Sequence, residues 1–286
     1  MSGDGIGIAS HTSWCPGCGN FGILRAEKAA LDGLGLKARD VLLVSGIGQA
    51  AKTPHYVAAN GLCGLHGRAL ANATGAKLAN HALTVLVHTG DGDCLAEGGN
   101  HFLHAVRRNV DLTCIIHMNQ VYGLTQGQAA PTSDPGFVTR TQPHGVISAR
   151  ANALTLALAA SGTFVARGFT GNEEHLSGLI RKAIEHRGFS VIEVLQPCVS
   201  MNHVNTFAWY KERVYDVTAA PGTDPADRSA AFAKALEWGD RIPIGVLYRE
   251  ERPCFEDLVP VLRGGPLVRQ PALQPEVLEA LVDELC

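Results

Sequence analysis

The sequence lacks the features that would place the protein in a membrane or on nucleic acid. No apolar run approaches the ~20 residues that a membrane span needs. The N-terminus has no charged start followed by an apolar stretch, so we expect no signal peptide and a cytoplasmic location. The net charge is only −3, which gives no reason to expect a nucleic-acid partner.

Acidic residues are also missing from one long internal stretch, since residues 41–90 contain no aspartate or glutamate. Within it, SGIGQAA (45–51) fits the G-x-G-x-x-A pattern of a dinucleotide-binding turn, but that fold needs an acidic residue about 20 positions later to bind the ribose. An NAD-dependent dehydrogenase is therefore a distant alternative. The stretch does carry Lys52, His66 and Arg68, which favour an anionic substrate or a diphosphate.

The composition suits a large α/β protein, because 46% of the 286 residues are hydrophobic and 18% are charged. Predicted strands and helices alternate as far as about residue 196, which indicates a doubly wound, mostly parallel sheet. The strands are expected over residues 41–44, 83–87, 112–117, 163–166 and 189–195, and the helices over residues 21–34, 66–78, 99–108, 151–160 and 173–186.

Pro197 ends this alternation, and the chain beyond it is richer in proline and charge. We therefore predict an α/β domain over residues 1–200 and a C-terminal extension over residues 201–286 that wraps the core or a partner chain. In the extension, residues 244–248 could pair with a neighbouring strand. A terminal helix is predicted over residues 275–285, with its proline in the first turn.

Polar residues follow two of the predicted strands at a fixed spacing. Gly90-Asp91-Gly92-Asp93 comes after the strand over 83–87, and Asn119 comes after the strand over 112–117. Open α/β sheets bind ligands at the carboxyl ends of their strands, so Asp91 and Asn119 are expected side by side. A carboxylate, an amide oxygen and a nearby carbonyl suit Mg²⁺ shared with phosphates. Two ordinary turns are the alternative interpretation.

Eight cysteines are many for a chain expected in a reducing compartment, where clustered thiols indicate metal or redox chemistry more often than disulfides. WCPGCGN (14–20) is a tight Cys-x-x-Cys turn. No strand precedes it, as a thioredoxin-like motif would require, and no second close cysteine pair completes a zinc site. Cys15 and Cys18 suit an iron–sulfur half-site, with Cys198 as the distant partner; two structural thiols are the alternative.

Together these motifs resemble the β subunit of the 2-oxoacid:ferredoxin oxidoreductases, which bind thiamine diphosphate. The resemblance covers about residues 11–215 and rests on several long segments. These are WCPGCGNFG (14–22), VSGIG (44–48), LHGRAL (65–70), GDGD (90–93), NQVYGLTQGQAAPTS (119–133), FVARGF (164–169), LQPC (195–198) and NTFAWYKERVY (205–215).

The resemblance implies which residues bind the cofactor. Mg²⁺ is held by Asp91, the Asn119 side chain and the Val121 carbonyl. Lys52 matches a basic position near the substrate end of the cofactor, and His66 and Arg68 are its expected catalytic companions. Further cofactor-binding positions are Gly19, Gly90, Gly92, Asp93, Tyr122, Gly123, Leu124 and Thr125.

The resemblance also implies the reaction. Thiamine diphosphate attacks the keto carbon of a 2-oxoacid, CO₂ leaves, and two electrons pass singly through a 4Fe-4S cluster to ferredoxin. Coenzyme A takes the acyl group, and the reverse reaction fixes CO₂. An α subunit supplies the glutamate that activates the cofactor and part of the substrate site, so this chain alone is expected to be inactive. The basic residues make 2-oxoglutarate a mild favourite over pyruvate.

The chain departs from the family pattern at the cluster. Family members supply four cysteines, and Cys15, Cys18 and Cys198 match three of them. The remaining one often follows Ser-Gly-Ile-Gly, where this chain has Gln49, which leaves Cys63 as the available replacement. If Cys63 does not reach, the cluster is three-iron, differently ligated or absent. A non-redox thiamine diphosphate-dependent lyase or synthase subunit is then the main rival, and a non-catalytic iron–sulfur module a further one.

Overall fold

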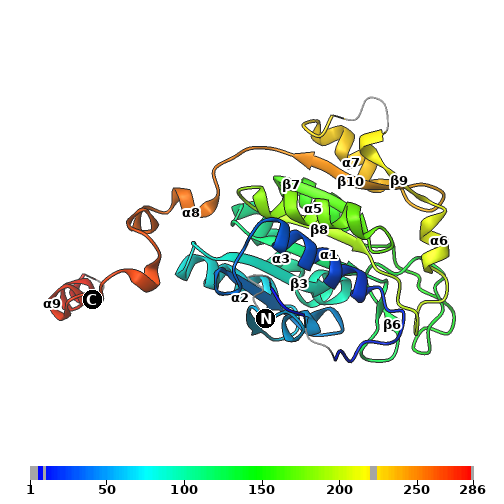
Figure 1. The fold of residues 1–286 in the computed structure, drawn as a ribbon, viewed down its shortest axis with the longest axis horizontal. Helices are drawn as coiled ribbons and strands as arrows, with labels where there is room; N and C mark the ends of the chain where they lie inside the picture. The colour runs from blue at the N-terminus through cyan, green and yellow to red at the C-terminus, as the bar shows by residue number, and fades with distance from the viewer. Residues whose placement is uncertain (1–5, 9–10, 220–223, 285–286) are drawn as a thin grey trace.

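The structure is a computed structural model that describes residues 6–8, 11–219 and 224–284. Within these ranges, eight strands form one sheet in the order β2-β1-β3-β4-β8-β7-β10-β9 (Figure 1). The strands are β1 (Val41–Ser45), β2 (Asn60–Cys63), β3 (Thr84–Gly90), β4 (Thr113–Met118), β7 (Phe164–Phe169), β8 (Ser190–Leu195), β9 (Val214–Asp216) and β10 (Ile242–Arg249).

Neighbouring strands are parallel from β2 across to β7. β10 then runs antiparallel to β7, and β9 runs parallel to β10. The predicted doubly wound, mostly parallel sheet is confirmed.

Helices cover both faces of the sheet and enclose two apolar cores. One layer contains α1 (Asn20–Gly33) and α5 (Glu173–Glu185), which lie side by side in front of the sheet in Figure 1. The opposite layer contains α2 (Ala69–Ala79), α3 (Gly99–Arg108), α4 (Ala153–Ala159) and α7 (Arg228–Leu236). Because both faces are covered, β1, β4, β7 and β8 are buried throughout, which explains their nearly continuous apolar sequences.

The predicted helix over residues 66–78 begins only at Ala69. Residues 66–68 form a turn instead, in which Gly67 has φ +71° and donates its N–H to Asp93 Oδ1 at 2.7 Å. A left-handed residue cannot continue a right-handed helix, so the helix starts after the turn.

Several short elements were not predicted. They are β2, the hairpin strands β5 (Val121–Tyr122) and β6 (Gln128–Ala129), a π-helical turn (Asp93–Glu97), and the 3₁₀ turns Ala38–Asp40, Ala50–His55, Val217–Ala219, Pro260–Gly264 and Leu267–Arg269.

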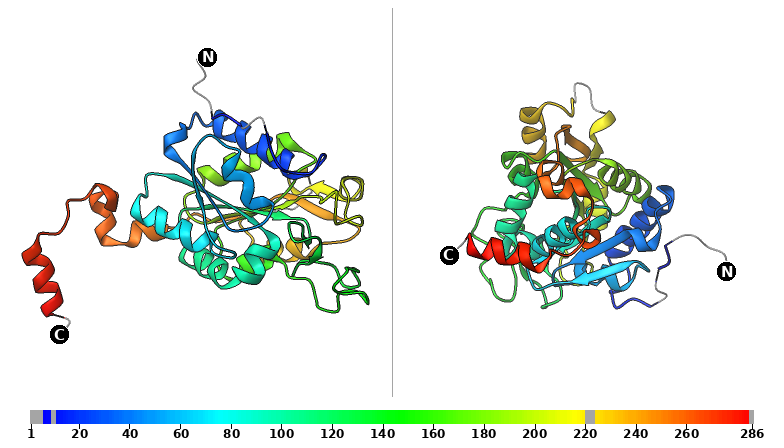
Figure 2. Two further views of the ribbon diagram at one scale, coloured as in Figure 1. Left: turned by 90° about the horizontal axis from the view of Figure 1, so that it is seen from below. Right: turned by 90° about the vertical axis from the view of Figure 1, so that its left-hand side faces the viewer.

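The chain after residue 200 has two different parts. Its first part, with α6 (Phe207–Lys211), β9, α7 and β10, joins the main body, and the strand predicted over 244–248 is confirmed as part of β10. Its last part, with α8 (Phe255–Leu258) and α9 (Pro275–Asp283), leads away from the sheet (Figures 1 and 2). No residue of α9 is buried; residue 285 of the predicted terminal helix lies outside the described residues.

Across the described ranges, the structure contains no helix long and apolar enough to span a membrane.

Candidate active site

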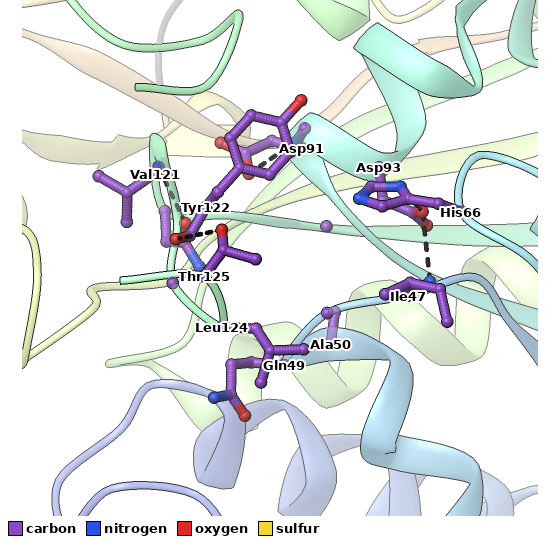
Figure 3. Close-up of a pocket in the computed structure, with 15 residues that line it drawn as sticks. Ile47, Gln49, Ala50, His66, Asp91, Asp93, Val121, Tyr122, Leu124 and Thr125 are labelled. Atoms are coloured by element: carbon purple, nitrogen blue, oxygen red, sulfur yellow. Dashed lines mark hydrogen bonds and ion pairs between the residues drawn. The ribbon is translucent and has the colours of Figure 1, made fainter. Parts of the chain in front are cut away.

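The parallel strands bring their C-terminal loops together around one pocket, between the loops after β1, β3 and β4 (Figure 3). Because β3 and β4 are neighbours, with Gly90 opposite His117, both Asp91 and Asn119 reach it. The lining residues are Ile47, Gly48, Gln49, Ala50, His66, Gly90, Asp91, Gly92, Asp93, Asn119, Val121, Tyr122, Gly123, Leu124 and Thr125. The structure thus collects every predicted Mg²⁺ and cofactor residue except Gly19.

Asp91 is the fixed acid of this pocket. It is only 1% exposed, and its Oδ2 accepts hydrogen bonds from the Gln120 N–H (2.7 Å) and the Thr132 hydroxyl, while Oδ1 accepts one from the Gly92 N–H (3.0 Å). Burial raises the pKa of Asp91 to about 6, and the three hydrogen bonds oppose the rise. A carboxylate has about four acceptor positions, so room remains for a cation.

Asn119 and Val121 flank a left-handed residue, Gln120, at φ +64°. The Gln120 carbonyl accepts a hydrogen bond from the Ser133 hydroxyl, and its side-chain amide donates to the Thr132 carbonyl at 2.9 Å. This turn places the Asn119 side chain and Val121 on one wall, where Asn119 Oδ1 accepts the Val121 N–H at 3.1 Å. Together with Asp91, these groups offer the hard oxygen ligands that Mg²⁺ requires.

Asp93 also lines the pocket, but the protein already occupies its carboxylate. Oδ1 accepts hydrogen bonds from the N–H groups of Ile47 (3.2 Å) and Gly67 (2.7 Å), and Oδ2 accepts one from the Thr89 hydroxyl (2.7 Å). His66 Nδ1 lies 2.7 Å from Oδ1. Asp93 therefore holds the loops after β1 and β2 against the end of β3.

Tyr122 and His66 meet a carboxylate that the sequence had not singled out, that of Glu97. The Tyr122 hydroxyl donates to it at 3.2 and 3.3 Å, and His66 Nδ1 lies 3.5 Å from it. Burial and the charge of Glu97 both raise the pKa of Tyr122, so this side chain is a neutral donor at physiological pH. Gly92 packs beneath the ring, where an added Cβ would lie 2.5 Å from Tyr122 Cε1.

Two predicted catalytic residues are not in the lining. Arg68 donates to the backbone carbonyls of Glu97 (3.2 Å) and His66 (3.4 Å), and Lys52 Nζ donates to the Ser13 hydroxyl at 3.0 Å. Their catalytic role stays a prediction.

Gly19 lies outside the lining as well. Its N–H donates to the Pro197 carbonyl at 3.3 Å, and an added Cβ would lie 2.9 Å from Gln196 Cγ. In this structure Gly19 permits close packing of the start of α1 against residues 196 and 197.

Three predicted cluster cysteines, Cys15, Cys18 and Cys198, line a second pocket beside the first. Burial raises the pKa of the Cys18 thiol to about 11; the Asn20 backbone N–H opposes the rise, and charge on Cys198 and Cys15 adds to it. The two pockets share a wall made by Gln49, Asn119, Gly123 and Leu124.

Cys63 is not part of this second pocket. It ends the edge strand β2, opposite Ser45 of β1, and its Sγ lies 3.5 Å from His55 Nε2. Among the residues that the structure describes, no group of three or more His, Cys, Asp or Glu side chains could hold a single metal ion. A cluster makes a different demand, because its thiolates bind different irons. Three thiols around one pocket suit a cluster; a fourth from Cys63 does not.

A buried chain of polar side chains runs from α1 into the sheet and ends at this second pocket. Glu27 Oε2 lies 2.9 Å from His88 Nε2, His88 Nδ1 lies 3.0 Å from His117 Nε2, and His117 Nδ1 lies 2.8 Å from Asn20 Oδ1. All four residues are buried, and Asn20 lines the pocket. Burial lowers the pKa of His117 well below its usual value, so its ring is neutral.

Comparison with known proteins agrees with this geometry. Residues 45–194 match the family model of the C-terminal TPP binding domain of thiamine pyrophosphate enzymes. Residues 198–264 match the family model of the C-terminal region of the pyruvate ferredoxin oxidoreductase beta chain. The fold and the pocket therefore define one component of a thiamine diphosphate-dependent enzyme.

Individual relatives narrow the family. The chain is 49% identical to the 2-oxoacid:ferredoxin oxidoreductase subunit beta of Saccharolobus solfataricus, over 83% of this chain and 82% of that protein. It is 43% identical to the 2-oxoglutarate oxidoreductase subunit KorB of Mycobacterium tuberculosis, over 70% of this chain and 53% of that protein.

A solved structure gives the same answer. The 2-oxoglutarate:ferredoxin oxidoreductase from Magnetococcus marinus, with 2-oxoglutarate, coenzyme A and succinyl-CoA bound, has a TM-score of 0.88 and 34% identity over 96% of this chain and 94% of that chain. The protein belongs to the β subunits of the 2-oxoacid:ferredoxin oxidoreductases, which confirms the predicted family and enzyme class.

Sequence reasoning missed residues that build the site from a distance. Thr132 reaches Asp91, and the Tyr210 hydroxyl reaches Gln120 Oε1 at 3.3 Å. The signal for Thr132 was its place in the polar loop over 122–143. The segment over 45–51, which resembles a dinucleotide turn, instead supplies one wall of the pocket.

Proposed function

We propose that this β subunit binds thiamine diphosphate in the first pocket, with Mg²⁺ held by Asp91, Asn119 and the Val121 carbonyl. With an α subunit it catalyses the CoA-dependent oxidative decarboxylation of a 2-oxoacid to an acyl-CoA and CO₂. Electrons pass through an iron–sulfur cluster in the second pocket to ferredoxin, and the reaction is reversible. The observation that carries the proposal is that a pocket with oxygen donors shares a wall with a pocket of three cysteines.

Thiamine diphosphate, when bound, supplies the chemistry that breaks the bond between the keto carbon and the carboxylate of the substrate. The residues of this chain bind and orient it. Asp91 is held by three hydrogen bonds and therefore offers a rigid anchor to the cation. Tyr122 contributes a hydroxyl that stays protonated, and Asp93 keeps the surrounding loops in place.

The pocket is incomplete without a partner chain. The family resemblance calls for a glutamate beside the cofactor's pyrimidine ring, and none of the described residues in the lining is a glutamate. Glu97 lies behind the lining, bound by Tyr122. The α subunit therefore provides the activating glutamate.

We favour 2-oxoglutarate as the substrate. His66 lines the pocket and Arg68 is fixed beside it, so positive charge is available for a second carboxylate. The M. tuberculosis relative is named a 2-oxoglutarate oxidoreductase subunit, and the M. marinus structure holds 2-oxoglutarate.

The test is an anaerobic assay of the co-expressed αβ complex with a redox dye across a series of 2-oxoacids. We expect CoA-dependent dye reduction, fastest with 2-oxoglutarate and absent from the β subunit alone. Asp91→Ala abolishes both activity and thiamine diphosphate binding, whereas Asp40→Ala, at an exposed turn, retains both. A colourless, iron-free complex that still decarboxylates would instead identify the non-redox lyase or synthase.

A further inference from the structure

The wall shared by the two pockets contains a buried polar atom without a hydrogen-bond partner among the described residues, the side-chain oxygen of Gln49. In Figure 3 the amide group of Gln49 points away from Asp91 and Asp93. It therefore serves the second pocket, which it lines together with the three cysteines. Buried acceptors are rarely left unpaired, so this oxygen calls for a ligand.

Contacts on two sides fix Gln49 next to the thiols. The Trp14 ring N–H donates to the Gln49 carbonyl at 2.8 Å, and Trp14 directly precedes Cys15. On the other side, a Cβ added to Gly123 would lie 3.6 Å from Cys198 Sγ and 4.0 Å from Gln49 Cγ. Gln49 thus lies between the Cys15–Cys18 turn and Cys198.

We propose that this pocket holds an iron–sulfur cluster through three thiolates, those of Cys15, Cys18 and Cys198, with its fourth corner facing the Gln49 side-chain oxygen. The inference rests on the proposed electron transfer, and it replaces Cys63 as the fourth ligand. A neutral amide oxygen binds iron more weakly than a thiolate does. It also removes one negative charge from the cluster, which raises the reduction potential.

The iron at the fourth corner should therefore leave on mild oxidation. A [4Fe–4S]²⁺ cluster that gives up one electron and one Fe²⁺ becomes [3Fe–4S]⁺. Ferricyanide, added as the oxidant, accepts the electron.

The experiment uses the αβ complex purified anaerobically, with iron and sulfide analysis and EPR spectroscopy during ferricyanide titration. In the wild type we expect loss of about one iron per cluster and the EPR signal of a three-iron cluster. Gln49→Cys supplies the missing thiolate and slows this conversion at least about tenfold. Gln126→Cys adds a thiol to the same pocket away from that corner, and Cys63→Ser removes the rival ligand; both should behave like the wild type.

The inference is wrong if Cys63→Ser loses iron, if Gln126→Cys protects the cluster as well as Gln49→Cys does, or if the wild-type complex contains no cluster. Dye reduction with 2-oxoacids, measured on the same samples, tests the proposed function separately. An oxidation-labile cluster in a complex that turns over no 2-oxoacid would overturn the proposed function and leave the ligand assignment standing.

Discussion

The side chains of Asn119 and Gln196 are joined directly, with Asn119 Nδ2 donating a hydrogen bond to Gln196 Oε1 at 3.0 Å. The amide nitrogen of the same Gln196 donates to Cys18 Sγ at 3.6 Å. Gln196 is buried, so no water competes for these contacts. One amide therefore links the proposed Mg²⁺ site to the cysteine pocket.

Replacing Gln196 with methionine keeps the side-chain volume and removes both hydrogen bonds. Asn119 loses the group that orients it, so we expect the affinity of the αβ complex for thiamine diphosphate and Mg²⁺ to fall about tenfold. The reduction potential of a cluster bound at Cys18 should also fall, because hydrogen bonds to sulfur stabilise the reduced state. Calorimetric titration and a redox titration followed by EPR measure the two effects.

Gln196→Glu is the matched control, because a carboxylate still accepts from Asn119 but donates nothing to Cys18. We expect it to retain cofactor affinity better than Gln196→Met does, while the potential falls in both. An unchanged potential in both variants would show that the contact with Cys18 has no influence on the cluster.

Asp91 and Asp93 are expected to respond differently to replacement by asparagine. Asp93 accepts hydrogen bonds from Ile47, Gly67 and Thr89, so Asp93→Asn leaves buried donors unpaired and should lower the free energy of unfolding by about 2 kcal/mol. Asp91→Asn should instead chiefly weaken Mg²⁺-dependent cofactor binding. Urea unfolding and calorimetric titration separate the two. Loss of binding without loss of stability in Asp93→Asn would show that Asp93 contacts the cofactor directly.

The sheet and the meeting of Asp91 with Asn119 could be predicted because short sequence patterns determine them. The strands before these residues are apolar runs that are buried almost throughout. A strand–helix–strand unit of this length places the next strand alongside the first, and the polar residues follow both at the same edge.

Contacts between distant loops could not be predicted in this way. Thr132 reaches Asp91 and Gln196 reaches Asn119 only because the folded chain brings their loops together. Gln49 and Cys63 make the same point, because both follow strands at one sheet edge. The path of the loop after β1, held by Trp14 and Asp93, brings Gln49 to the cysteine pocket, whereas Cys63 stays on the outer strand.

The stability of the protein should depend on pH through His186, which lies buried after α5 with its Nε2 2.9 Å from the Thr163 hydroxyl. Burial lowers the pKa of His186, whereas the unfolded chain titrates near the usual value of about 6.5. Below that pH the unfolded state binds more protons, so the stabilisation is complete above about pH 6.5 and is lost as the pH falls.

His186→Gln keeps a partner for Thr163 but does not titrate. Between roughly pH 7 and pH 5.5, the wild type should lose up to about 1 kcal/mol more stability than this variant in urea unfolding. Parallel pH profiles for the two proteins would rule out this role for His186.

Glu27 offers the sharpest test of the buried chain that runs to the cysteine pocket. It is fully buried, with His88 Nε2 at 2.9 Å from its Oε2. Removing one member of a buried ionisable pair leaves the other without compensation, so Glu27→Gln should lower the free energy of unfolding by about 3 kcal/mol. The control lies on the same helix, where Arg25 pairs with Glu173 at 2.6 Å in an exposed position. Arg25→Ala should cost less than about 1 kcal/mol. Equal losses in urea unfolding of the two variants would mean that the buried chain adds nothing beyond a surface ion pair.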